Sequence, residues 1–250
     1  MKKIAIIPAR YASSRFPGKP LALLKDKPMV MWVYDAVKAS GLFDKVVVAT
    51  DDERIVAAVV SLGGEAMMTS SLLSCGTKRC EAVLSALEAR GERFDLVVNV
   101  QGDEPLVEAS QLSAVISLFE DKDCQIGTLA KRITKLEELQ NPNCVKVVWS
   151  QNRAIYFSRN IIPYQRGRSE SEYLQYHIYY KHIGLYAYKS SVLHKIVALK
   201  TSPLEKAESL EQLCWLENGY RIDVTETDFE SIGVDTPEDL ERVNEMLDKQ

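Results

Sequence analysis

Short apolar runs rich in β-branched residues recur through the first half of the chain, with helix-length segments between them. The runs span Lys3–Ile7, Lys45–Val48, Leu96–Val100 and Gln125–Leu129. Each run is apolar along most of its length instead of alternating, which is typical of strands buried on both faces of a parallel sheet. We therefore predict a buried strand at each run.

The segments between the runs show the spacing of helices. Asp52–Ser61 is one such segment, and we predict that Asp51 caps it, because aspartate is favoured just before a helix. Apolar side chains in a later segment recur three and four positions apart and would share one helical face; they are Cys80, Val83, Leu84 and Leu87. The alternation of strands and helices predicts an α/β fold with a mostly parallel sheet.

The rhythm changes near residue 141. Strand-like runs at Cys144–Ser150, Ala154–Phe157 and Ile183–Tyr188 are separated by the polar stretch Gln165–Gln175. An irregular polar segment of this length is typical of an inserted arm or subdomain. We predict one domain over residues 1–250, with an inserted subdomain at about 141–200.

Two helices are predicted after this insertion, near Ser209–Asn218 and at Pro237–Leu247, with a strand at Arg221–Thr225 between them. The last helix carries an apolar stripe that includes Leu240 and Val243. Such a stripe indicates a helix that packs one face against the rest of the fold.

Composition and charge narrow the class of protein. With 250 residues, 46% of them hydrophobic, the chain is long enough to bury one substantial core. A formal net charge of -4 gives no basic footprint for a nucleic-acid backbone, so we expect no nucleic-acid partner and only local anion sites.

The five cysteines form no C-x-x-C pair and have no spaced histidines, which argues against a zinc site or a disulfide framework and favours a reducing cytoplasm. The opening MKKIAIIPAR is interrupted by Pro8 and Arg10 and is too short for a signal peptide or membrane span, so we expect a cytoplasmic protein without membrane contact.

The loop after the first predicted strand gathers cationic and small polar side chains. Its members are Arg10, Ser13, Ser14, Arg15, Gly18 and Lys19. Ligands bind at the carboxyl ends of parallel strands, and a triphosphate needs cationic donors, small residues near its oxygens and no carboxylate close by. We predict an anion-binding loop, with an ordinary solvated basic loop as the alternative. A P-loop is disfavoured because Pro20 stands where its Ser or Thr would be, and no G-x-G-x-x-G opens a helix.

An acidic pair follows the third predicted strand. The sequence QGDEP at 101–105 places Asp103 just past that strand, beside a glycine that permits close approach. Magnesium favours one or two carboxylates together with phosphate oxygens and water, and Asp235 supplies a second carboxylate in the sequence GVDTPED. The alternatives are a plain turn at Asp103 and a plain helix start at Asp235, with Thr236 as the cap and Pro237 in the first turn.

Several segments together carry a resemblance to a known family. They read IIPARYASSRFPGKPL, VATDDERI, VVNVQGDEP, IYFSRNIIP, YYKHIGLYAY, LEQL with WLENGY, and IGVDTPEDLERV. In this order, over nearly the whole chain, they resemble the 3-deoxy-manno-octulosonate (Kdo) cytidylyltransferases, or CMP-Kdo synthetases. The opening segment also occurs in sialic-acid cytidylyltransferases, whereas VQGDEP, YFSR-x-x-IP and KHIGLYAY in this order are specific to the Kdo enzymes.

The resemblance implies both a fold and a reaction. The fold would be a Rossmann-like nucleotidyltransferase of the glycosyltransferase-A type, whose small projecting subdomain makes a homodimer. The enzyme would transfer CMP from CTP to the anomeric hydroxyl of Kdo, release pyrophosphate and so activate Kdo for lipopolysaccharide synthesis. Mg²⁺ would be the cofactor, and CTP and Kdo would be the small-molecule partners.

The resemblance also implies roles for individual residues by position. Catalysis would fall to Lys19, Arg10, Asp103 and Asp235, and the last two would hold Mg²⁺. The nucleotide would be bound by Arg10, Ser13, Ser14, Lys19, Cys75, Gly76, Thr77, Arg79 and Asp103. The sugar would be bound by Arg15, Gln101, Arg159, His182, Tyr186 and Glu211. For His182, a hydrogen-bonded structural histidine is the alternative.

Two places depart from the family pattern. The family's Ser-Gly-Thr-(Asp or Glu)-Arg loop reads CGTKR at 75–79, so that Lys78 reverses a charge, and the family's LEQLR ends here in Cys214. Neither change touches the predicted metal carboxylates or the anion-binding loop. The departures keep three alternatives open: a uridylyl or adenylyl transferase, an enzyme for another acidic sugar such as 8-amino-Kdo or a nonulosonic acid, and a nucleotide-binding homologue with impaired catalysis.

Overall fold

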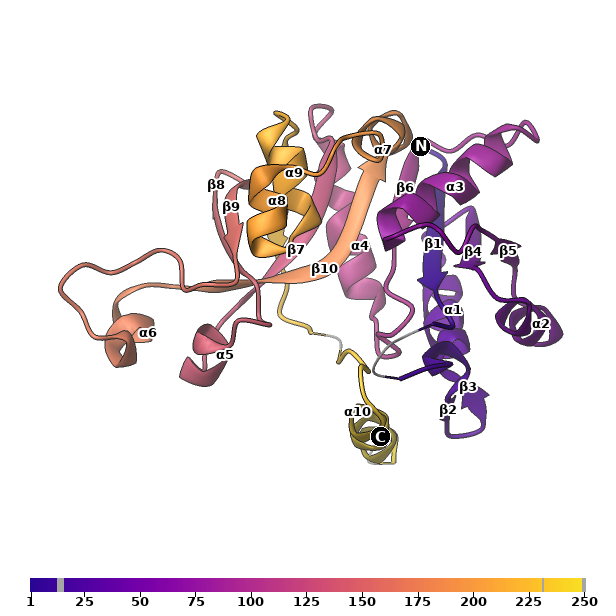
Figure 1. The fold of residues 1–250 in the computed structure, drawn as a ribbon, viewed down its shortest axis with the longest axis horizontal. Helices are drawn as coiled ribbons and strands as arrows, with labels where there is room; N and C mark the ends of the chain where they lie inside the picture. The colour runs from indigo at the N-terminus through magenta and orange to yellow at the C-terminus, as the bar shows by residue number, and fades with distance from the viewer. Residues whose placement is uncertain (13–15, 231, 249–250) are drawn as a thin grey trace. The chain divides into compact units, whose positions relative to one another are not determined.

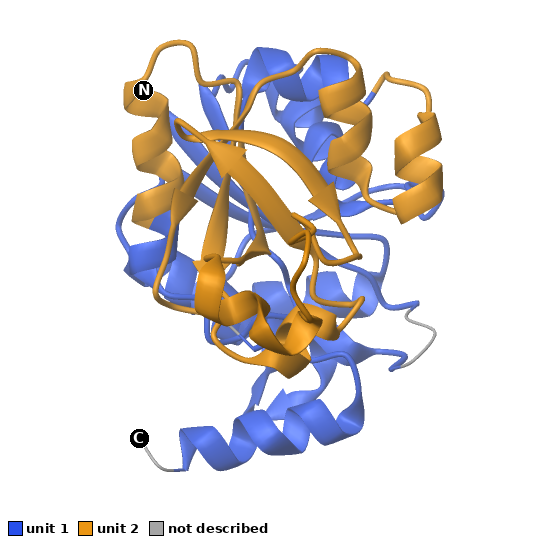
Figure 2. Cartoon of the chain, turned by 90° about the vertical axis from the view of Figure 1, so that its left-hand side faces the viewer, with its two compact units in different colours: residues 1–112, 188–197, 231–250 blue, residues 113–187, 198–230 orange. Residues whose placement is uncertain are grey.

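The structure is a computed structural model that describes residues 1–12, 16–230 and 232–248 (Figure 1). The chain divides into two compact units (Figure 2). Unit 1 comprises Met1–Leu112, Tyr188–Val197 and Ser231–Gln250, and unit 2 comprises Ser113–Ala187 and Ala198–Glu230. The single domain with an inserted subdomain at about 141–200 stays a prediction.

Unit 1 is built on a parallel sheet with the strand order β5-β4-β1-β6. The strands are β1 (Lys3–Ala9), β4 (Lys45–Thr50), β5 (Ala66–Met68) and β6 (Leu96–Asn99). Ile4 and Ile6 of β1 have no exposed surface, as expected for a central strand covered on both faces. The predicted strands at Lys3–Ile7, Lys45–Val48 and Leu96–Val100 are therefore confirmed, with ends shifted by one or two residues.

Helices flank this sheet, together with a small hairpin. The elements are the 3-10 turn η1 (Lys19–Leu21), the hairpin strands β2 (Leu23–Leu24) and β3 (Lys27–Pro28), α1 (Met29–Ala39), α2 (Glu53–Ser61), α3 (Gly76–Glu88), α7 (Ser190–Ile196) and α10 (Pro237–Leu247). The apolar face predicted for α3 is buried as expected. The predicted cap of α2 is wrong by one residue: the side chain of Asp52 accepts from the backbone N–H of Arg54 at 2.9 Å, while Asp51 pairs with Arg79.

Unit 2 holds a mixed sheet with the order β10-β7-β11-β9-β8, in which β8 also pairs with β10. Its strands are β7 (Ile126–Arg132), β8 (Lys146–Ser150), β9 (Arg153–Ser158), β10 (Tyr180–Lys189) and β11 (Ile222–Glu226). The β11–β7 pair is parallel, whereas β9 runs antiparallel to both β11 and β8. The predicted α/β class is confirmed. In unit 1, all pairings among β5, β4, β1 and β6 are parallel.

Short helices complete unit 2, and α4 (Ala109–Ser117) contains the boundary between the units. They are η2 (Leu118–Glu120), α5 (Leu136–Gln140), η3 (Glu170–Glu172), α6 (Tyr173–Tyr176), α8 (Pro203–Glu208) and α9 (Glu211–Glu217). The helix predicted from Ser209 starts later, because Ser209 adopts a left-handed φ of 52° that ends α8. Across the part of the chain that the structure describes, none of the helices combines the length and apolar character needed to cross a membrane.

Candidate active site

A cavity of about 500 Å³ opens in unit 1 where β1 and β6 end. Among the described residues, the lining comes from the ends of these strands, the segments that follow them, the start of α3 and the segment just before α10. The lining residues are Pro8, Ala9, Arg10, Ala12, Lys19, Pro20, Gly76, Arg79, Gln101, Gly102, Asp103 and Asp235. The carboxyl edge of the parallel sheet is where the sequence predicted ligand binding. Ser13, Ser14 and Arg15, which were predicted to act here, lie outside the described residues.

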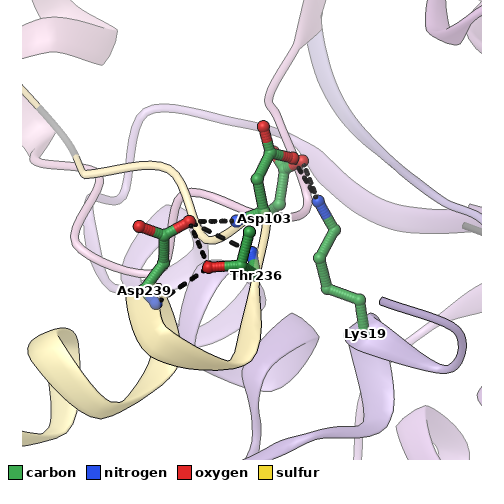
Figure 3. A network of polar contacts seen from close by, with 5 residues as sticks. Lys19, Asp103, Thr236 and Asp239 are labelled. Atoms are coloured by element: carbon green, nitrogen blue, oxygen red, sulfur yellow. Dashed lines mark hydrogen bonds and ion pairs between the residues drawn. The ribbon is translucent and has the colours of Figure 1, made fainter. Parts of the chain in front are cut away.

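Lys19 contacts both predicted metal carboxylates, Asp103 (Figure 3) and Asp235. Its Nζ lies 2.6 Å from Asp103 Oδ2 and 3.1 Å from Asp235 Oδ1. The lysine side chain is 11% exposed, whereas those of Asp103 and Asp235 are 35% and 48% exposed. The ammonium is therefore shielded while both carboxylates keep an accessible side. The lysine predicted to hold a triphosphate lies, in this structure, between the carboxylates predicted to hold metal.

The position of Asp103 depends on the glycine before it. A Cβ added to Gly102 would lie 2.6 Å from the backbone oxygen of Pro8, so no larger residue fits without moving the ends of β1 and β6. The backbone oxygen of Asp103 accepts from the N–H of Val234 at 2.9 Å. This hydrogen bond ties the turn after β6 to the segment that carries Asp235.

Asp235 is held by the start of α10, where Thr236 and Asp239 contact each other (Figure 3). Thr236 and Asp239 form a capping box, and Asp239 Oδ2 accepts from the backbone N–H groups of both Asp235 and Thr236 at 3.0 Å. These hydrogen bonds lower the pKa of Asp239, against the effect of its partial burial. The helix-start interpretation of this segment is confirmed, and the same helix start brings Asp235 to the cavity.

The N-terminal turn of α3 contributes Gly76 and Arg79 to the cavity. Arg79 has no exposed surface, and its guanidinium lies 3.0 Å from Asp51 Oδ2 and also donates to Thr69. Arg79 is thus anchored by protein partners, as one expects for a buried cation. Cys75, at the N-cap position, makes no capping hydrogen bond with its side chain, and the neighbouring Thr77 is 3% exposed.

Three of the predicted sugar residues gather around β10 in unit 2. The ring centroids of His182 and Tyr186 are 5.2 Å apart, and Trp215 of α9 meets Tyr186 edge-on at 5.3 Å. His182 Nε2 lies 3.1 Å from the hydroxyl of Thr128, and burial lowers the pKa of His182 to about 3, so the ring is neutral near pH 7. Burial raises the pKa of Tyr186 well above its usual value, and the nearby charge of Glu211 adds to the rise.

Arg159, the fourth predicted sugar residue of unit 2, is fixed by backbone partners. Its Nε donates to the carbonyl of Glu208 at 2.7 Å and its Nη1 to the carbonyl of Pro142 at 3.1 Å. The carbonyl of Arg159 accepts at 2.6 Å from Nζ of Lys146, which also donates to two carbonyls of the loop before β8. Lys146 is fully buried, and this burial lowers its pKa.

The structure therefore groups the predicted residues by unit. Arg10, Lys19, Gln101, Asp103 and Asp235 share the cavity of unit 1 with Gly76 and Arg79, while Arg159, His182, Tyr186 and Glu211 belong to unit 2. Sequence reasoning missed Asp239, although its position three residues after a threonine cap is the spacing of a capping box. It also missed Trp215 and Lys146, for which the sequence carries no separate signal.

The carboxylates of the cavity fit magnesium better than a transition metal. Among the described residues, no group of three or more His, Cys, Asp or Glu side chains is placed to hold a metal ion. Asp103 and Asp235 supply two hard oxygen ligands. Magnesium is commonly held in this way, with substrate phosphates and water at its other positions.

The fold and the cation-and-carboxylate cavity define a nucleotidyltransferase. A family model described as "Cytidylyltransferase" matches residues 4–224. A relative from Bacteroides thetaiotaomicron named 3-deoxy-manno-octulosonate cytidylyltransferase is 53% identical, over 99% of this chain and 98% of the relative. A relative with the same name from Thermodesulfovibrio yellowstonii is 47% identical, also over 99% of this chain and 98% of its own length. The chain belongs to the 3-deoxy-manno-octulosonate cytidylyltransferase family.

Solved structures agree with this assignment. The structure of a CMP:2-keto-3-deoxy-manno-octonic acid synthetase complexed with CTP matches with a TM-score of 0.90 and 36% identity, and covers 100% of this chain and 99% of that one. A 4-diphosphocytidyl-2C-methyl-D-erythritol synthase from Anaerococcus prevotii matches with a TM-score of 0.62 at 14% identity, over 99% of both chains. The second likeness concerns the fold alone, which is the predicted Rossmann-like nucleotidyltransferase fold.

Proposed function

We propose that the protein transfers CMP from CTP to the anomeric hydroxyl of Kdo and releases pyrophosphate. The observation that carries the proposal is the cavity of unit 1, where Lys19 meets two carboxylates at the carboxyl edge of a parallel sheet. Its support from outside the structure is the 53% identity to a relative named 3-deoxy-manno-octulosonate cytidylyltransferase. Both the site and the family point to nucleotidyl transfer.

Asp103 and Asp235 would hold Mg²⁺ in this reaction. Both approach one ammonium group from different segments of the chain, so both can face a single cation. A magnesium ion held there would supply positive charge to the triphosphate and Lewis acidity toward the attacking hydroxyl. The protein's part is to present two oxygen ligands on a scaffold that the Val234–Asp103 hydrogen bond keeps together.

The cationic side chains would neutralise charge. CTP and Kdo are both anionic, and Arg10 and Lys19 line the cavity in which they would meet. As the anomeric oxygen bonds to the α-phosphorus, the bond from that phosphorus to the oxygen bridging to the β-phosphate breaks. Pyrophosphate leaves and the hydroxyl proton passes to solvent. Positioning and charge stabilisation supply most of the acceleration in such a step.

The residues of unit 2 would recognise the sugar. His182 is neutral near pH 7 because burial lowers its pKa to about 3, so it offers a donor and an acceptor to sugar hydroxyls instead of a charge. Tyr186 and Glu211 offer further polar groups of both kinds. Arg159 carries the planar guanidinium that suits the carboxylate of an acidic sugar.

The two departures from the family pattern do not favour an impaired homologue. Lys78 donates to the Ser74 hydroxyl at 3.3 Å. Cys214 is 4% exposed, with its Sγ 3.3 Å from the carbonyl of Lys200. Neither belongs to the described lining of the cavity. Catalysis is therefore expected to be retained.

A pyrophosphate-release assay across nucleotides and acidic sugars tests the proposal. CTP with Kdo and Mg²⁺ should release pyrophosphate, whereas UTP, ATP, 8-amino-Kdo and a nonulosonic acid should react much more slowly. Asp103→Asn should lower turnover by about 100-fold or more while CTP still binds, and Asp26→Asn, at an exposed position of the same unit, should not. Absence of pyrophosphate from CTP and Kdo would overturn the proposal.

The same proposal includes a cytoplasmic homodimer that supplies lipopolysaccharide synthesis. None of the five cysteines, all of them among the described residues, forms a disulfide, which suits a reducing compartment. Unit 2 exposes large apolar side chains, with Tyr164 76%, Tyr176 54% and Ile178 45% exposed. Apolar surface of this kind favours coverage by a second subunit.

A further inference from the structure

Lys19 lies between Asp103 and Asp235, the two carboxylates proposed to hold Mg²⁺. Its Nζ is 2.6 Å from one carboxylate and 3.1 Å from the other, and the lysine side chain is only 11% exposed (Figure 3). A lysine ammonium is a compact point charge with several donors. Its charge balances the two carboxylates in the way that a bound cation would.

We propose that Lys19 is an exchangeable counter-ion of Asp103 and Asp235. It prevents a free divalent ion from binding the two carboxylates, and it releases them only when the triphosphate binds. This inference rests on the proposed function, because it concerns the Mg²⁺ and CTP of that reaction. Metal and nucleotide then bind cooperatively, and Lys19 is the side chain responsible.

The charges of the cavity explain why a free divalent ion does not simply displace the lysine. The described lining has three cationic side chains, Arg10, Lys19 and Arg79, and its carboxylates are Asp103 and Asp235. A divalent ion that took both carboxylates would leave the Lys19 ammonium beside it, poorly solvated and without an anionic acceptor in that lining. Like charges at such short range repel strongly when water is partly excluded.

A triphosphate removes this obstacle. Its oxygens accept from the displaced ammonium and at the same time ligate the incoming metal, so both cations gain a partner in one event. Reciprocity then requires that metal strengthens CTP binding by the same factor by which CTP strengthens metal binding.

The scaffold favours an exchange of cations over a rearrangement of the site. Asp103 is tied to the segment of Asp235 through the N–H of Val234, 2.9 Å from the Asp103 carbonyl. The backbone of Asp235 donates to Asp239 at 3.0 Å. Both carboxylates thus stay in place while the flexible four-carbon stem of lysine moves its ammonium.

The proposal is tested by measuring Mn²⁺ binding to the full-length protein without nucleotide. The electron paramagnetic resonance signal of free Mn²⁺ reports how much of the ion is unbound. Lys19→Met keeps the stem and removes the charge, so we expect it to bind Mn²⁺ about tenfold or more tightly than the wild type. Lys27→Met removes a charge from the Lys27–Asp35 pair in the same unit and should leave Mn²⁺ affinity unchanged. Adding CTP should raise the Mn²⁺ affinity of the wild type far more than that of Lys19→Met.

Two further measurements keep the outcome unambiguous. The double variant Lys19→Met/Asp103→Asn should lose the tighter Mn²⁺ binding of Lys19→Met, which assigns that effect to this site. Circular dichroism checks that each variant is folded. The exchange is overturned if Lys19→Met binds Mn²⁺ no more tightly than the wild type, or if CTP does not change the wild-type affinity. If the wild type binds no Mn²⁺ through Asp103 even with CTP, the proposed metal site itself fails, and the two failures are thereby distinguished.

Discussion

Gly102 shows, at the scale of a single residue, how closely the ends of β1 and β6 approach. The atom that a Cβ would meet at 2.6 Å is the backbone oxygen of Pro8. A backbone atom in a buried strand cannot swing aside as the tip of a long side chain can. The glycine is therefore a condition for the position of Asp103, one residue further along.

Gly102→Ala is expected to push Asp103 away from Asp235. We expect turnover to fall by about tenfold or more and the free energy of unfolding to fall by about 1–3 kcal/mol, because overpacking forces the backbone to shift. Steady-state kinetics and urea unfolding measure the two effects. Gly233→Ala is the matched control, since its Cβ meets nothing within 4 Å. Wild-type turnover in Gly102→Ala would contradict this account of the site.

At the scale of elements, the buried Lys146 connects β8 to the end of β9. Its Nζ donates to the carbonyls of Asn141, Cys144 and Arg159 at 3.0, 2.7 and 2.6 Å. One side chain therefore links three backbone acceptors from two segments of the chain. Because one of them belongs to Arg159, the lysine also positions a residue proposed to bind the sugar.

Lys146→Met keeps the length of the side chain but removes this buried donor from three backbone carbonyls. We expect the free energy of unfolding to fall by about 3 kcal/mol, as measured by urea titration. The KM for Kdo should rise more than kcat falls, and Lys146→Arg should recover part of both losses. Lys206→Met, at an exposed position on α8, serves as the control. If the two methionine variants are equally stable, Lys146 does not have this role.

β10 carries a histidine whose burial has a consequence for acid stability. The pKa of His182 falls from 6.5 to about 3 on folding because of that burial. Between these values the unfolded chain binds a proton that the folded chain does not, so stability decreases as the pH falls below about 6.5. Replacing the histidine removes this part of the acid sensitivity.

Urea unfolding of wild type and His182→Gln at about pH 7.5 and about pH 4.5 measures the effect. The wild type should lose about 2–3 kcal/mol more than the variant between the two conditions. His177→Gln, at an exposed position, should behave like the wild type. Equal losses in wild type and His182→Gln would show that the imidazole takes up its proton in the folded state too.

At the scale of the whole molecule, the exposed apolar side chains of unit 2 bear on the proposed dimer. Ile178 is 45% exposed, and an aspartate there would place a charge inside any interface that covers it. Ile178→Asp should sediment as a monomer in analytical ultracentrifugation, whereas Val60→Asp, at a 55% exposed position on α2, should sediment as the wild type does. An unchanged Ile178→Asp dimer would place the interface elsewhere.

The sequence predicted the positions of strands better than it predicted the local partners of charged side chains. Asp103 was expected just past a strand and Asp235 just before the last helix, as two carboxylates for one magnesium ion, and both lie within reach of Lys19. The cap of α2 was misplaced because Asp51 is drawn to Arg79, a partner 28 positions away that periodicity does not reveal. The partners of Arg159 are main-chain carbonyls, which every residue possesses, so no sequence pattern marks them.

Activity is expected to depend on the attachment of α10 to the rest of unit 1, because its local detachment would be enough to abolish turnover. The helix reaches the rest of unit 1 through a small apolar cluster whose fully buried members are Leu24, Met29, Val234 and Val243. Segments held by few contacts open at a lower free energy than the whole protein, and opening here would withdraw Asp235 while the parallel sheet persists. Turnover should therefore disappear at a lower urea concentration than the circular dichroism of the sheet, and saturating CTP with Mg²⁺ should narrow that interval, because ligands stabilise the state that binds them. The working range of the enzyme would then follow from the attachment of a single helix, and a variant with a firmer attachment would stay active in more urea with its sheet unchanged.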